Sequence, residues 1–455
     1  MSKQLINDFT TGSVPKQLIK FASPLFLSNL LQVAYNMVDM IIVGQANGKV
    51  GLSAVSVGGD VANFLTFIAM GFSSAGQVII SQFLGANQKE KVGKFIGTMF
   101  SFLFTVAIIL STLCFIFREP IMRFMNTPPE SWNEAMNYAS ICIVGMVAIY
   151  GYNIISAVLR GLGDSKHPFV FISLAAVLNV ILDLVFVLWI DMGAGGAALA
   201  TVISQCVSFI SCGVFLWRKK AHLGFDISAR DFAMWDLPLL STLTKLGIPM
   251  AIKSAAIHFS KLFVNSWINS YGVAVSALAG IANKLSSVSN LISNSVNAAG
   301  ASMVGQNVGA EKYERVPKIM LYSFAFTFVI STLLSGAIVF FPDQIFSIFS
   351  SDADVLKLVP EYIPIAILMF YGSAFRTPAN AMINGCGNYK VNFAMALFDG
   401  IILRIGLSVL FGLWLGYGYL GFWLGDALAG FTPFFIGGVY YLSGTWKTRR
   451  YIIKE

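Results

Sequence analysis

The chain has 455 residues, of which 56% are hydrophobic and only 11% are charged. A soluble domain carries about 25% charged residues, so this composition excludes an ordinary soluble protein and requires that much of the surface faces lipid. Lys and Arg exceed Asp and Glu by 30 to 22, which gives a net charge of +8. In a soluble protein, that excess of positive charge would suggest binding to nucleic acid. In a membrane protein the position of the charges decides their meaning, and we expect no nucleic-acid partner.

Apolar runs between polar interruptions predict where the chain crosses the membrane. A helix needs about 20 residues to cross the hydrocarbon core. In chain order the predicted spans are 17–44, 51–82, 93–117, 134–159, 168–190, 194–217, 239–269, 273–306, 317–341, 358–385, 389–415 and 418–442. The predicted fold class is therefore an all-α polytopic membrane protein with twelve transmembrane helices.

The loop charges predict the orientation. With an even number of spans both termini share one side, and nearly all loop Lys and Arg residues fall on that side. Only Lys49, Arg118, Arg123 and Lys357 fall on the other. Because cytoplasmic loops carry the excess of positive charge, we expect a multi-pass protein of the plasma (inner) membrane with both termini in the cytoplasm.

The sequence repeats itself at an offset of 224 to 225 residues. The matching landmarks are Gln82–Ala86 with Gln306–Ala310, Pro24 with Pro249, Gly161–Asp164 with Gly385–Asn388, and Gly193 and Gly196 with Gly418 and Gly421. Four landmarks in one order indicate duplication. We predict two pseudo-symmetric six-helix bundles: an N-terminal lobe over 1–220, a cytoplasmic linker over 221–236, and a C-terminal lobe over 237–455.

Polar residues inside the spans of the first half predict a coupling site. Gln32, Asn36 and Asp39 share one face of the first span with Ser28. Asn179 and Asp183 are neighbours at i and i+4 in the fifth span, and Thr201 on the sixth supplies a hydroxyl. Burial disfavours a charged carboxylate, so such a group can take up a proton; alternatively, these oxygens suit a monovalent cation, in which case Asp39 and Asp183 are metal ligands. The competing interpretation is that each Asp only hydrogen-bonds a neighbouring helix.

The second half is basic where the first is acidic. Together with Gln32 and Asn36, its polar residues predict a substrate cavity lined by Lys253, His258, Lys261, Asn283, Lys284 and Arg376. Charges within spans are costly and default to functional hypotheses, and this surplus of cations suggests an anionic or zwitterionic substrate. The competing interpretation pairs the cations with Asp399, Asp426 or Asp60, or lets them reach the membrane surface.

Other chemistry finds no support in the sequence. There is no phosphate loop, no zinc-like pairing of His and Glu, and no nucleophile elbow. The five Cys residues lack metal-binding spacing. We therefore expect neither an enzyme nor a cofactor.

Several motifs resemble those of the multidrug and toxic compound extrusion (MATE) transporters over nearly the whole chain. They are Pro24, Val38–Gly44, Gln82–Ala86, Leu159–Asp164, Leu178–Asp183 and Gly193–Thr201. The resemblance implies two six-helix lobes, cation-coupled export and alternation between outward- and inward-facing states. It also implies a coupling site at Asp39, Asn179, Asp183 and Thr201, and a hinge at Pro24.

The chain departs from that family in its second half. Several members carry an acidic residue in the seventh span and another in the tenth, whereas Pro249–His258 and Phe375–Asn380 carry cations or amides. The first-half carboxylates are therefore the better candidates for coupling.

The function predicted is a secondary-active antiporter, driven by H⁺ or Na⁺, that exports amphipathic organic compounds or drugs. We expect a monomer whose partners are small organic substrates, the coupling ion and the lipid bilayer. The alternatives are a flippase for a lipid-linked precursor and, with less support, a channel.

Overall fold

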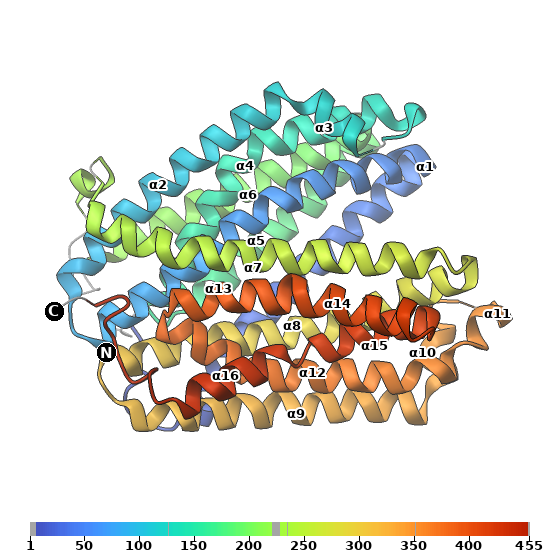
Figure 1. Ribbon diagram of the computed structural model, residues 1–455. Helices are drawn as coiled ribbons and strands as arrows, with labels where there is room; N and C mark the ends of the chain where they lie inside the picture. The colour runs from blue at the N-terminus through green and yellow to red at the C-terminus, as the bar shows by residue number, and fades with distance from the viewer. Residues whose placement is uncertain (1–5, 126, 221–227, 234, 351, 454–455) are drawn as a thin grey trace. The chain divides into compact units, whose positions relative to one another are not determined.

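The computed structural model describes residues 6–125, 127–220, 228–233, 235–350 and 352–453. Within these residues every regular element is a helix (Figure 1). Residues 221–227 and 234 of the predicted linker lie outside the described part of the chain.

The first six predicted spans correspond to long helices. These are α1 (Val14–Gly85), α2 (Lys89–Ile116), α4 (Trp132–Gly161), α5 (Lys166–Asp183) with a π-helical continuation Leu184–Trp189, and α6 (Gly193–Lys219). The helix α1 contains two spans, because Gly48 has φ 59° and ψ −146° and breaks it near its middle. Shorter elements join them: α3 (Arg118–Phe124) and a 3₁₀ turn at Pro129–Ser131.

The last six spans follow the same plan. They are α7 (Leu237–Asn269), α8 (Val273–Gly309), α9 (Val316–Phe340), α12 (Val359–Cys386), the run α13 (Tyr389–Leu397), Phe398–Ile402, α14 (Leu403–Val409) and Leu410–Trp414, and the pair α15 (Gly418–Ala429) and α16 (Thr432–Leu442). The connecting elements are η4 (Ala229–Phe232), η5 (Tyr313–Arg315), α10 (Pro342–Ser347) and α11 (Ala353–Leu356).

Hydropathy separates these helices into two groups. In the described part of the chain, eight are long and apolar enough to cross a membrane by length and composition alone, and α1 is one of them although it holds two predicted spans. The helices α7, α8 and α12 are equally long but fall outside this group. They carry the polar and basic residues noted in the sequence, and buried helices tolerate such residues where they face protein or water.

The described chain divides into two compact units. Unit 1 comprises 1–8 and 23–247, and unit 2 comprises 9–22 and 248–455. In unit 1, α4 contacts α2 and α6; in unit 2, α12 contacts α9 and both α15 and α16. Each unit has its own apolar core, for example around Ile143 and Met146 in unit 1 and around Phe346 and Phe422 in unit 2.

Close helix contacts repeat at the sequence offset. A Cβ on Gly161 would lie 2.9 Å from the Cβ of Ile80, and a Cβ on Gly385 would lie 2.6 Å from that of Val304. The two pairs are 224 residues apart. Small residues let helix backbones approach closely, so these glycines fix the same packing in each unit.

The end of the repeated Gly-Leu/Cys-Gly motif is a helix cap. Asp164 Oδ1 accepts hydrogen bonds from the amides of Lys166 and His167 at the start of α5. Asn388 Oδ1 accepts equivalent bonds from Lys390 and Val391 at the start of α13. Asp and Asn at this position satisfy amides that have no partner within the helix, which explains why the motif recurs.

Candidate functional site

The acidic residues of unit 1 meet where three helices come together. Asp39 lies on α1, Asn179 and Asp183 on α5, and Thr201 on α6. The Thr201 hydroxyl donates to Asp39 Oδ2 at 3.4 Å, and the Asn179 amide donates to Thr201 Oγ1 at 3.4 Å. The carboxyl group of Asp183 lies next to that of Asp39. The structure therefore brings all four predicted residues into one cluster.

The cluster is short of hydrogen-bond donors. Asp183 is fully buried, and Asn179 and Asp39 are 1% and 7% exposed. Among the described residues, both oxygens of Asp183, Oδ1 of Asp39 and Oδ1 of Asn179 are buried without a hydrogen-bond partner. A buried acceptor without a donor costs free energy, and two adjacent carboxylates repel each other as well. A proton or a monovalent cation between them would relieve both costs.

The spacing of the sequence explains why two polar side chains of α5 face the cluster. Asn179 and Asp183 are one turn apart and so face the same way. Asp183 is the last residue of α5 before the π-helical run Leu184–Trp189. Wider π turns are typical of functional sites because they shift the face that a helix presents.

Sequence reasoning missed a second polar contact one turn away. The Gln205 amide donates to the Tyr35 hydroxyl at 3.3 Å, and both side chains are buried. Tyr35 precedes Asp39 by four residues, and Gln205 follows Thr201 by four. The i, i+4 spacing could have identified both, and their contact holds α1 and α6 together beside the cluster.

The other polar residues of the first span lie elsewhere. Asn36 is exposed and Gln32 is half-buried. Ser28 donates to the Pro24 carbonyl at 2.8 Å, within the same helix. Among the described residues, none of the three forms a hydrogen bond to the carboxylate cluster.

Unit 2 holds a buried charge network instead. Arg404 contacts both carboxylates, donating to Asp399 Oδ1 at 2.9 Å and to Asp426 Oδ1. Arg376 lies farther away, 3.9 Å from Asp399 Oδ2. Lys253 donates to a neutral partner, Asn380 Oδ1, at 2.6 Å. The pairing with Asp399 and Asp426 that the sequence left open is thus partly realised, closely by Arg404 and at longer range by Arg376.

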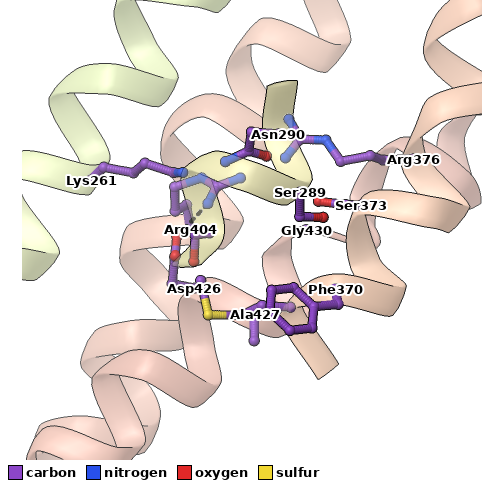
Figure 2. Close-up of a pocket in the computed structure, with 12 residues that line it drawn as sticks. Lys261, Ser289, Asn290, Phe370, Ser373, Arg376, Arg404, Asp426, Ala427 and Gly430 are labelled. Carbon is purple, nitrogen blue, oxygen red and sulfur yellow. Dashed lines mark hydrogen bonds and ion pairs between the residues drawn. The ribbon is translucent and has the colours of Figure 1, made fainter. Parts of the chain in front are cut away.

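A small cavity of about 30 Å³ lies beside this network in unit 2. Figure 2 shows Lys261 and Arg376 reaching toward it from opposite sides. Its lining is Lys261, Ser286, Ser289, Asn290, Met369, Phe370, Ser373, Arg376, Arg404, Asp426, Ala427 and Gly430. Two of the predicted cavity residues are therefore brought together. His258, Asn283 and Lys284 are exposed on α7 and α8 and do not line this space.

Comparisons with known proteins agree with the duplicated fold. The family model MatE matches residues 24–185 and again residues 249–410. The probable multidrug resistance protein YpnP of Bacillus subtilis is 29% identical over 443 residues, which cover 97% of this chain and 98% of YpnP. The FAD transporter of Shewanella oneidensis is 24% identical over 395 residues, which cover 83% of this chain and 86% of that protein.

A solved structure has the same fold. It is a MOP superfamily transporter from Pyrococcus furiosus, described as having a binding pocket of reverse polarity. Its TM-score is 0.86 at 20% identity, with 100% of both chains covered. Two family matches in register with the internal repeat, together with this fold, lead to one assignment: the chain belongs to the MatE family of multidrug and toxic compound extrusion transporters.

Proposed function

We propose that this transporter exports amphipathic organic compounds in exchange for H⁺ or Na⁺ bound at Asp39 and Asp183. The observation that carries the proposal is the set of buried oxygens without donors on Asp39, Asn179 and Asp183. The multidrug resistance protein among the relatives supports the class of substrate. Occupation by one cation supplies the missing positive charge, and its loss restores the repulsion between the carboxylates.

The position of Asp39 connects ion binding to helix geometry. Asp39 and Pro24 lie on the same helix, α1, about four turns apart. A proline inside a helix removes one backbone hydrogen bond and is a natural place to bend. We propose that binding and release of the ion at Asp39 shift α1 between two arrangements about Pro24, and so alternate access to the substrate.

The basic residues of unit 2 support a preference for anionic or zwitterionic substrates. We assign the contact with the substrate's negative group to Lys253, Lys261 and Arg376, with Gln32, Asn36, His258, Asn283 and Lys284 as further polar contacts. One relative transports FAD, which is an anion. The proposal also places both termini in the cytoplasm and the active unit as a monomer.

The test is efflux from proteoliposomes under a pH gradient and a sodium gradient imposed separately. We expect wild type to follow one gradient, and Asp39→Asn and Asp183→Asn to lose coupled efflux by at least a hundredfold, because an amide neither binds a proton nor carries the charge. The control is Asp191→Asn, which changes an exposed carboxylate in the same half and is expected to leave efflux unchanged.

Two results would contradict the proposal. One is normal gradient-driven efflux by both site variants. The other is wild-type efflux that is indifferent to both gradients. In either case the unit 1 carboxylates would be structural only.

A further inference from the structure

The charge network of unit 2 has more cations than its carboxylates neutralise. Both buried carboxylates, Asp399 and Asp426, are already bound to Arg404. Arg376 is 3.9 Å from Asp399, too far for a hydrogen bond. Lys261 has no carboxylate within ion-pair distance among the described residues. The three cations Arg376, Arg404 and Lys261 therefore exceed the two carboxylates by one positive charge at the cavity.

The cavity is lined by donors as well as by charge. Ser286, Ser289, Ser373 and Asn290 line the same space as Lys261 and Arg376. Ser289 and Ser373 are buried, at 4% and 6% exposed. In Figure 2 the side chains of Asn290 and Arg376 approach each other at one end, and Lys261 comes in beside Arg404 at the other. Cations with hydroxyl and amide donors make a setting that favours an anion.

The size of the cavity limits the occupant. A cavity needs roughly 10–15 Å³ of free space to hold one water molecule, so a volume of about 30 Å³ admits water or one small ion. Sites for drug-sized molecules are about 300–1,000 Å³, so a whole organic substrate does not fit. An uncompensated buried charge is strongly destabilising, whereas one compact monovalent anion would neutralise the one surplus positive charge.

We infer that this pocket of unit 2 binds a small monovalent anion, with chloride as the ion of matching size and charge. Arg376 and Lys261 hold it from opposite sides, and the serine hydroxyls and the Asn290 amide complete its surroundings. The chloride is then a resident ion of the transporter and not a transported substrate. A substrate with a negative group would have to replace this ion in order to contact the same two cations.

The experiment measures binding of radiolabelled chloride to the purified full-length protein, freed of chloride by exchange into gluconate at constant ionic strength. We expect saturable binding of one chloride per chain in wild type. Arg376→Gln and Lys261→Met should each weaken it by at least tenfold, because each removes one of the two facing charges. Lys318→Gln removes an exposed lysine of α9 and should bind chloride as wild type does.

Absence of saturable binding to folded wild type would overturn the inference and leave water as the occupant. Unchanged binding in both site variants would overturn it too. Should Arg376→Gln not fold, Arg376→Lys in lipid nanodiscs keeps the charge and is expected to retain saturable chloride binding, whereas its loss in folded Arg376→Lys would count against the inference. The measurement involves no gradient and no substrate, so its outcome is separate from that of the efflux proposal.

Discussion

Thr201 takes part in two hydrogen bonds of the unit 1 cluster. It donates to Asp39 and accepts from Asn179. A hydroxyl oxygen can also ligate a sodium ion, whereas a proton shared between two carboxyl groups does not require it. The role of this one side chain therefore depends on which ion is bound.

Replacing Thr201 distinguishes the two ions. If sodium drives efflux, Thr201→Val keeps the shape, removes the oxygen, and should raise the half-saturating sodium concentration roughly tenfold, the size of a lost contact to a charge. If protons drive efflux, the same variant should change the pH dependence little. Thr201→Ser is the control and should behave as wild type with either ion. A loss of efflux in Thr201→Ser equal to that in Thr201→Val would contradict a role for the hydroxyl.

The sequence predicted the site residues of unit 1 better than the charge pairs of unit 2. The unit 1 candidates could be found because Asn179 and Asp183 are one turn apart and motifs mark the rest. The pairing in unit 2 was only one of two interpretations of the sequence, because Arg404 and Asp426 come from different helices, α14 and α15, and no periodicity relates them. Roles in coupling and substrate contact remain predictions for both sets.

At the scale of elements, α5 and α13 begin with equivalent side-chain caps. Asp164 and Asn388 each accept two amides at the start of a helix. Sequence alone predicted the repeat of this motif but assigned it no structural role. The reason for the repeat is local, since each helix that follows needs acceptors for its first amides.

Removing one cap should destabilise the protein modestly. We expect Asp164→Ala to cost about 1 kcal/mol, the usual price of losing a side-chain cap, and to lower the melting temperature measured in detergent. Asp164→Asn keeps an acceptor oxygen and should melt close to wild type. Equal melting of Asp164→Ala and wild type would show that the cap contributes nothing to stability.

Spans were easier to predict from sequence than their interruptions. All twelve predicted spans correspond to helices, and most of them are marked by length and low polarity, which hydrocarbon demands, whereas α7, α8 and α12 are less apolar. Wider π turns after Asp183 and around Phe398, and the separation of α15 from α16 near Gly430, left no hydropathy signal. They depend on packing between helices rather than on composition.

For the molecule as a whole, the division into units does not follow the division into halves. Residues 9–22 belong to unit 2, and residues up to 247 belong to unit 1. In unit 2, the Phe9 amide donates to Gln306, and the Phe9 carbonyl accepts from Asn307 and Arg315. The chain thus leaves each unit within a helix, just before Pro24 in α1 and just before Pro249 in α7.

This attachment can be tested by hydrogen exchange. We expect Arg315→Gln to raise amide exchange across residues 9–20 severalfold, because Arg315 donates to the carbonyls of Phe9, Thr11 and Gly12. Lys318→Gln, three residues on, should leave the exchange unchanged. Equal protection in the two variants would mean that apolar contacts alone hold the segment.

The exchanged segments have a consequence for how such a chain arose. Each six-helix half lacks a piece of its own bundle, which the other half supplies at the start of its first helix. A single ancestral half would have been incomplete alone. Two copies would have completed each other by exchanging the segment at the start of the first helix, as domain-swapped dimers do. Fusion of the two genes would then have made this exchange between two subunits an intramolecular contact within one chain.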